Sequence, residues 1–239
     1  MRLDNYLVDI KIFDSRTKAK QAIMRGEILV DGEVVDKPAY SVSSDVKIEY
    51  VYSEKFVSLG GYKLSKALKD FNFIVKDFVC ADIGASTGGF TDCLLKCGAK
   101  KVYSVDLNDE LLHKDLKSNN NVIPLIKNAR ELIKSDFDSE LDLIVADLSF
   151  ISATMVMDVF SKLLNKGKCL IILIKPQFEV GGKRKFKNGI IKDDTLQKAA
   201  CQKVIDCALS CGFKIINVTT APIVDGKNLE YLALFDKTN

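Results

Sequence analysis

The feature that most constrains the fold is an apolar run at 78–83 that leads directly into a glycine-rich loop, Gly84-Ala-Ser-Thr-Gly-Gly. A helical stretch at 88–97 follows, and the next apolar run ends on Asp106. Glycines in such a loop permit a tight turn and let the backbone approach a ligand closely. An acid that ends the following strand is placed to accept hydrogen bonds from ribose hydroxyls. The pattern therefore predicts a nucleotide-binding strand, loop and helix.

Apolar runs of strand length alternate with helical stretches along most of the chain. We predict strands at 78–83, 101–106, 122–125, 141–146, 169–174, 213–218 and 229–235, and helices at 63–71, 88–97, 151–164 and 194–211. This alternation implies an α/β fold with a doubly wound, mostly parallel sheet. The loop between the last two strands contains no helix, so we expect one antiparallel strand at that end.

Residues 1–51 predict a small separate α+β domain, joined by a linker at 52–60 to a catalytic domain at 61–239. Ser15 caps a predicted helix at 16–25, and Asp31-Gly32 predicts a hairpin turn. The helix carries cations and no acid from 15 to 26, which suits contacts with sugar-phosphate. A solvated helix face is the alternative. The predicted RNA-binding residues are Arg2, Arg16, Lys18, Lys20 and Arg25, with the loop residues Lys183, Arg184, Lys185 and Lys187.

Composition excludes some classes of protein. The 239 residues have a formal net charge of +3, so affinity for nucleic acid must come from local patches. The longest apolar run, 169–174, is too short to span a bilayer, and the start shows no signal peptide. Seven cysteines and a single histidine, His113, lack the spacing of a metal site. We expect a soluble cytoplasmic protein with reduced cysteines and no metal.

Two details of the glycine loop favour S-adenosylmethionine as the cofactor. Asp82 precedes the loop, where it could hold the amino group of the ligand, and Gly-x-Ser-x-Gly-Gly departs from the dinucleotide pattern. A dehydrogenase is the alternative, which binding of S-adenosylmethionine without nicotinamide would exclude. The expected cofactor-binding residues are Asp82, Gly84, Ser86, Thr87, Gly88, Gly89, Phe90, Asp106, Leu107, Asn128, Ala129 and Asp147.

Four separate motifs each contribute one ionisable residue: Lys63, Asp147, Lys175 and Glu230. Asp147 and Lys175 follow the predicted strands 141–146 and 169–174, whose carboxyl ends meet at a ligand-binding edge. A ribose hydroxyl is a very weak acid, so its base must be strong yet unprotonated, which suits a lysine beside another cation. We expect Lys63 and the cofactor's sulfonium to supply that charge. The four residues predict methyl transfer to a ribose 2′-hydroxyl.

These motifs resemble the TlyA family of bacterial ribosomal-RNA 2′-O-methyltransferases, whose catalytic domain is of the FtsJ type. The matching stretches are 60–64, 82–95, 147–152, 173–179, 188–193 and 228–231. The resemblance implies a Rossmann-like class I methyltransferase sheet and a catalytic tetrad of Lys63, Asp147, Lys175 and Glu230, with Lys175 as the base. It also implies a cytidine of ribosomal RNA, within a ribosomal subunit, as the acceptor.

The first residues and the linker refine this resemblance. Segments 2–7, 15–19, 26–32 and 37–38 resemble the small RNA-binding domain named after ribosomal protein S4. Leu59 stands where the family usually has an arginine. The chain resembles the shorter type of the family, which modifies large-subunit (23S) RNA. Because the family also carries a haemolysin label, a membrane-active protein remains one alternative, and an RNA-binding protein with an inactive methyltransferase fold is another.

Overall fold

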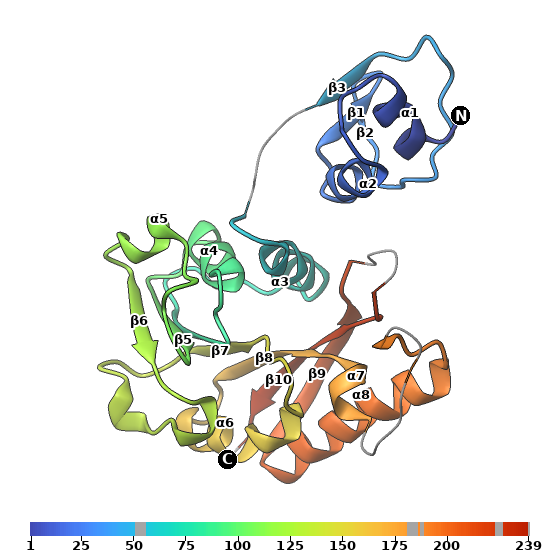
Figure 1. The fold of residues 1–239 in the computed structure, drawn as a ribbon. Helices are drawn as coiled ribbons and strands as arrows, with labels where there is room; N and C mark the ends of the chain where they lie inside the picture. The colour runs from blue at the N-terminus through green and yellow to red at the C-terminus, as the bar shows by residue number, and fades with distance from the viewer. Residues whose placement is uncertain (51–55, 181–185, 187–188, 223–226, 239) are drawn as a thin grey trace. The chain divides into compact units, whose positions relative to one another are not determined.

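The computed structural model describes residues 1–50, 56–180, 186, 189–222 and 227–238. The chain divides into two compact units, Met1–Lys55 and Phe56–Asn239, and each has its own hydrophobic core (Figure 1). The predicted linker at 52–60 falls partly outside the described residues. Leu59 and Gly60, which the sequence placed in that linker, are the first residues of a helix.

The N-terminal unit is a small α+β fold. It contains α1 (Leu3–Asp9), α2 (Arg16–Met24), β1 (Ile28–Val30), β2 (Glu33–Val34) and β3 (Ile48–Tyr50). Both β2 and β3 pair antiparallel with β1. The Ser15 side chain caps α2, and Asp31 and Gly32 both have positive φ in the tight turn between β1 and β2. The predicted cap and hairpin are therefore confirmed.

The larger unit is built on a seven-stranded sheet in the order β6-β5-β4-β7-β8-β10-β9. Its strands are β4 (Val79–Ile83), β5 (Lys101–Asp106), β6 (Val122–Ile126), β7 (Leu143–Ala146), β8 (Cys169–Ile174), β9 (Phe213–Thr220) and β10 (Tyr231–Lys237). The pairs from β6 to β8 are parallel, whereas β10 is antiparallel to both neighbours. The doubly wound sheet and its antiparallel strand are as predicted.

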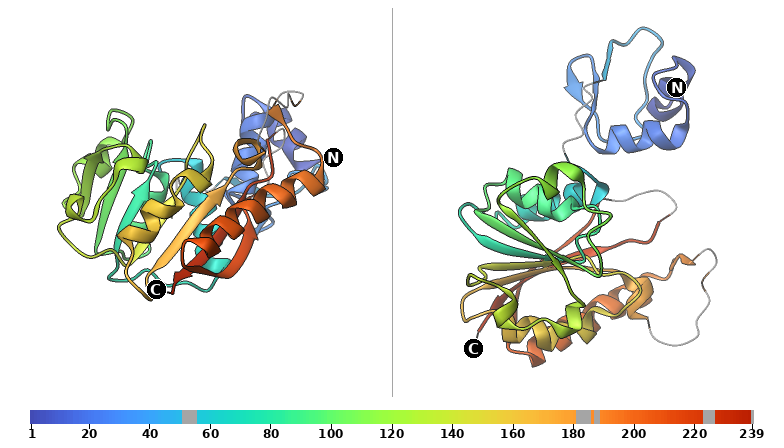
Figure 2. Two further views of the ribbon diagram at one scale, coloured as in Figure 1. Left: turned by 90° about the horizontal axis from the view of Figure 1, so that it is seen from below. Right: turned by 60° about the vertical axis from the view of Figure 1, so that its left-hand side comes forward.

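Helices cover both faces of this sheet. They are α3 (Leu59–Asp70), α4 (Gly89–Lys96), α5 (Lys114–Lys117), α6 (Met157–Leu163), α7 (Pro176–Glu179) and α8 (Asp194–Ser210), with short 3-10 turns η1 (Ala129–Glu131), η2 (Lys134–Asp136) and η3 (Ala153–Met155). Helices α3 and α4 lie on one face, and α6 and α8 lie on the other (Figure 2, right). The central strands β4, β7 and β8 are buried on both sides, which explains why they are almost continuously apolar.

Two helices differ from the prediction. The single helix predicted at 151–164 is divided into η3, which the side chain of Ser152 caps, and α6, with Val156 at φ of −116° between them. Helix α3 begins at Leu59, before the predicted start at 63. Its early start depends on close packing: a Cβ on Gly61 would lie 2.9 Å from the carbonyl oxygen of Gly89 in α4. The spacing of apolar residues along the chain predicts neither the cap by Ser152 nor the contact of Gly61 with α4.

Candidate active site

The glycine loop between β4 and α4 is fixed to the end of β5 through Asp106. One carboxylate oxygen of Asp106 accepts from the backbone N–H of Ser86 at 2.7 Å, and the other accepts from Leu107 at 2.7 Å. Each oxygen keeps a lone pair for a further donor. The side chain is therefore held in place and is still able to accept hydrogen bonds from ribose hydroxyls.

A cavity of about 420 Å³ lies beside this loop. Of the predicted cofactor residues, it is lined by Gly84, Ser86, Asp106, Leu107, Asn128, Ala129 and Asp147. Its wall includes apolar side chains of Leu107 and Leu148. A long pocket with apolar walls and a few polar groups is suited to a nucleoside.

A second cavity, of about 170 Å³, adjoins the first one. Gly84, Ser86, Asp147 and Ser149 line both. The predicted residues Asp82, Thr87, Gly89, Phe90 and Lys175 line the second cavity alone. Gly88, also predicted, lines neither and is the N-cap of α4. The two cavities form a continuous site along the carboxyl ends of β4, β5 and β7.

Asp82 is fully buried at the end of β4. One of its oxygens accepts from the backbone N–H of Thr91 at 2.8 Å and from the Thr91 hydroxyl at 2.7 Å. The other oxygen, Oδ1, has no hydrogen-bond partner among the described residues. Burial raises the pKa of Asp82 to about 7, although the bonds from Thr91 oppose that shift. An unpaired buried acceptor in a cavity wall is suited to a ligand's ammonium group.

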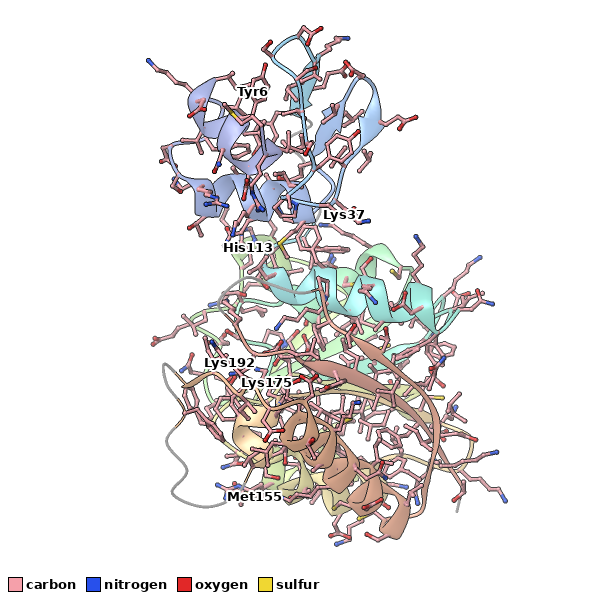
Figure 3. All side chains as sticks on the ribbon, turned by 90° about the vertical axis from the view of Figure 1, so that its right-hand side faces the viewer. Tyr6, Lys37, His113, Met155, Lys175 and Lys192 are labelled. Atoms are coloured by element: carbon pink, nitrogen blue, oxygen red, sulfur yellow. The ribbon has the colours of Figure 1, made fainter. Side chains whose placement is uncertain are left out.

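Asp147 and Lys175 form an ion pair beside the second cavity. Lys175 Nζ lies 2.5 Å from Asp147 Oδ1, and both side chains are mostly buried. The contact is not aligned as a hydrogen bond, so Asp147 Oδ1 has no such partner among the described residues. Lys175 instead donates to Ser149 Oγ at 2.8 Å. Lys175 is labelled in Figure 3, where β8 passes into α7.

Lys63 and Glu230 form the other ion pair of the predicted tetrad. Lys63 Nζ, on α3, lies 2.6 Å from Glu230 Oε2, just before β10. Because Tyr231 is paired with Ile174, the antiparallel register places Glu230 opposite the strand end that carries Lys175. The structure thus brings the four residues to one edge of the sheet as two ion pairs. Each lysine contacts a carboxylate, which agrees with the expectation that Asp147 and Glu230 orient the two amines.

The predicted RNA-binding cations of the N-terminal unit contact acidic residues that lie outside the predicted helix at 16–25. The fully buried carboxylate of Asp4 accepts from Arg2 at 3.0 Å and from Arg16 at 2.9 Å. Lys18 donates to Asp14 at 2.7 Å, and Arg25 donates to Glu27 at 2.6 Å. The basic face is therefore partly compensated. Lys183, Arg184, Lys185 and Lys187 lie outside the described residues.

Sequence reasoning missed several residues that line the site. Ser149 receives the hydrogen bond from Lys175, and its position directly after Asp147-Leu148 was the one available signal. Ser58 lines the second cavity, and Leu111 and Lys127 line the first. These three come from other segments, and nothing in their local pattern indicates that they face a ligand.

Comparison with known proteins places this geometry in a family. Residues 56–237 match the model of FtsJ-like methyltransferases, and residues 1–48 match that of the S4 domain. Hemolysin A of Brachyspira hyodysenteriae is 42% identical over 98% of this chain and 99% of its own length. The chain belongs to the TlyA/hemolysin A family of FtsJ-like methyltransferases.

Other members of this family have names that state an activity. The 16S/23S rRNA (cytidine-2'-O)-methyltransferase TlyA of Mycobacterium tuberculosis is 34% identical over 96% of this chain and 87% of its own length. The 23S rRNA (cytidine-2'-O)-methyltransferase TlyA of Campylobacter jejuni is 31% identical over 99% of this chain and 100% of its own length. A solved hemolysin-family structure from Streptococcus thermophilus has 34% identity and a TM-score of 0.75, covering 100% of this chain and 89% of its own.

Proposed function

We propose that this protein transfers a methyl group from S-adenosylmethionine to the 2′-hydroxyl of a cytidine in ribosomal RNA. The observation that carries the proposal is the Asp147–Lys175 ion pair, which lines the cavity adjoining a nucleoside-sized pocket. The family membership and the names of the TlyA relatives support the reaction class and the acceptor. The S4 domain supports a structured RNA as the substrate.

The residues that line the two cavities fit S-adenosylmethionine. Asp106 would accept from the ribose hydroxyls, and Asn128 and Ala129 would contact the adenine. Asp82 Oδ1, a buried acceptor without a partner among the described residues, would accept from the ammonium group of the methionine part. When bound, S-adenosylmethionine supplies an electrophilic methyl group and a positively charged sulfonium. The overlap of the two cavities at Gly84 and Asp147 suits a ligand that extends through both.

In this mechanism Lys175 removes the proton from the acceptor hydroxyl. Ser149 and Asp147 fix the direction of its amine, since Ser149 accepts its hydrogen bond and Asp147 lies within ion-pair distance. Lys175 must first release one of its own protons to bulk water before it can act as a base. The Lys63–Glu230 pair joins α3 to the segment before β10 and would hold these two segments together beside the strand end that carries Lys175.

We infer that the acceptor lies in large-subunit RNA. Both TlyA relatives are named for methylation of 23S RNA, and the Campylobacter jejuni relative is named for 23S RNA alone. Residues 1–51 would position the RNA, residues 61–239 would carry out the chemistry, and the site of action would be the cytoplasm.

Methyl incorporation into purified ribosomal subunits tests this function. Wild-type protein with labelled S-adenosylmethionine should label the large subunit, and mapping should find the methyl group on a cytidine ribose. The Lys175→Ala variant is the control for contaminating activity. Labelling of both subunits would correct the choice of subunit, and a failure to label either would refute the proposed function.

The hemolysin name of one relative favours a second candidate function, membrane lysis. No helix in the described part of the chain is long and apolar enough to cross a membrane. The Lys175→Ala variant separates the two functions in an erythrocyte lysis assay. Lysis by wild type and variant alike would establish a membrane activity that is independent of methyl transfer.

A further inference from the structure

A buried carboxylate outside the predicted tetrad, Glu179, connects the two chain segments that carry Asp147 and Lys175. Glu179 is the last residue of α7, one helical turn after Lys175, and its side chain is 2% exposed. Its Oε1 accepts from the backbone N–H of Ala153 at 2.7 Å, and its Oε2 accepts from the hydroxyl of Ser152. Both donors belong to the segment that follows Asp147.

These contacts close a loop of interactions around the site. The chain runs from Asp147 to Ser152, whose hydroxyl bonds to Glu179. It then runs back from Glu179 to Lys175, which contacts Asp147 and donates to Ser149. The segment is thus held at both ends, by the ion pair at one and by Glu179 at the other.

The segment needs such a restraint because its backbone is strained. Phe150, between Asp147 and Ser152, has φ of 67° and is 89% exposed. A non-glycine residue in the left-handed region is strained and persists only when surrounding contacts hold it. The contacts at Ser152 and Ala153 supply that hold on the far side of Phe150.

The chemistry of the contact requires a side chain with two hydrogen-bonding atoms, of which the one that faces the Ala153 N–H must be an acceptor. One oxygen of Glu179 receives a backbone N–H and the other receives a hydroxyl, and each donor would lose its partner with an apolar residue. Lys203 of α8 completes the site, since its ammonium lies 4.0 Å from Oε2 and donates to the Glu179 carbonyl oxygen at 2.9 Å. A carboxylate buried with this set of partners is costly to replace.

We propose that Glu179 is a positioning residue for methyl transfer. It holds the segment 147–153 against α7, so that Asp147 and Ser149 stay in place beside Lys175. The inference rests on the proposed function for its catalytic consequence. Its geometric part, that Glu179 restrains this segment, stands without it.

The first test compares three variants at saturating S-adenosylmethionine and ribosomal subunits. Glu179→Ala should lower kcat by about 10- to 100-fold, the range for misplacing a catalytic group by a fraction of an ångström to one ångström, with cofactor Kd within about threefold. Glu179→Gln should restore most of kcat, because its amide can accept from Ala153 and donate to Ser152. Asp142→Ala is the matched control, since this carboxylate bonds to Val79 and Lys168 at the opposite end of β7. It should cost stability but leave kcat nearly unchanged.

Hydrogen exchange supplies a readout that does not depend on activity. Glu179→Ala should speed exchange at the Ala153 amide and its neighbours in 148–156, with exchange in β5 unchanged. If Glu179→Ala fails to fold, Ser152→Ala can replace it, because it removes the hydroxyl that bonds to Glu179. It should also speed exchange at the Ala153 amide, but by less. A drop in kcat of less than tenfold in Glu179→Ala, or unchanged exchange at Ala153, would overturn the inference. A wild type that methylates no RNA would refute the proposed function but leave the exchange result to decide the restraint.

Discussion

Gly84 and Asp147 are in contact at the point where the two cavities join. Gly84 has φ of 84°, and a Cβ at this position would lie 2.6 Å from the carbonyl oxygen of Asp147. The end of β4 and the end of β7 can approach this closely only because residue 84 has no side chain. The glycine therefore decides how closely Asp147 approaches the loop, in addition to shaping the loop.

We expect Gly84→Ala to destabilise the protein and to impair methylation together. The left-handed φ alone costs about 1–3 kcal/mol, and the clash with Asp147 adds to that cost. Gly167→Ala is a matched control, because Gly167 has φ of 77° and a Cβ added there would meet nothing within 4 Å. Urea unfolding and methyl incorporation measure both effects. Equal losses in the two variants would show that the contact with Asp147 is unimportant.

Lys175→Ala should abolish methylation and leave the affinity for S-adenosylmethionine within a few-fold of wild type. Lys175→Arg should fail as well, because a guanidinium stays protonated at any pH at which the protein is folded. Single-turnover methylation and calorimetry measure the two properties separately. A near-wild-type rate in either variant at neutral pH would rule out Lys175 as the base.

Asp106→Ala should weaken cofactor binding by about 1–3 kcal/mol, the range for losing hydrogen bonds to a charged acceptor. Part of that loss comes from the loop, because Asp106 also accepts from the Ser86 amide. Asp106→Asn keeps one acceptor oxygen and should lose less. Calorimetry with S-adenosylhomocysteine checks this order, and unchanged affinity in Asp106→Ala would remove Asp106 from the cofactor site.

Asp82 should make stability depend on pH near neutrality. Burial raises its pKa from 3.8 to about 7, so its contribution is fully present below about pH 4 and is lost as the pH rises through 7. Asp82→Asn stays neutral throughout. Without cofactor, the variant should therefore gain stability relative to wild type between pH 5 and 8, by at most about 3 kcal/mol.

Asp142→Asn is the control for that experiment, because the pKa of Asp142 is shifted in the opposite direction. Burial raises the pKa of Asp142, but the hydrogen bonds from Lys168 and the Val79 amide outweigh this effect and lower the pKa below its usual value. Its contribution is lost only in acid, so its difference from wild type should stay flat from pH 5 to 8. Urea unfolding at several pH values measures both variants. A flat difference for Asp82→Asn would mean that Asp82 is ionised throughout.

In the N-terminal unit, Arg16 and Lys18 should respond differently to replacement. Arg16→Ala leaves the buried Asp4 with Arg2 as its remaining guanidinium partner, so it should destabilise that unit. Lys18→Ala removes a pair exposed on both sides and should cost little stability. If Lys18 contacts phosphate, the slope of log affinity against log salt for ribosomal RNA should fall by about 0.7–0.9. Parallel salt plots for Lys18→Ala and wild type would show that Lys18 makes no phosphate contact.

The sequence determined the framework of the larger unit. The bounds of β5 and β8 were predicted to the residue, and those of the other strands in this sheet to within a few residues. Strands buried on both faces appear as continuous apolar runs, and such runs end where the sheet ends. The same runs placed Asp106, Asp147 and Lys175 at strand ends, and the glycines marked the loop that follows the first strand of the sheet. Local pattern sufficed because each of these features belongs to a single segment.

Only the tertiary structure decided which charged groups pair with each other. Asp4 pairs with both Arg2 and Arg16, Glu230 pairs with Lys63, and Glu179 holds Ser152 and Ala153. Several of these partners lie on segments far apart in the chain, and side-chain type alone does not choose among 35 basic and 32 acidic residues. The choice depends on which segments the packed sheet and helices bring within about 3 Å of each other, the range in which a hydrogen bond forms.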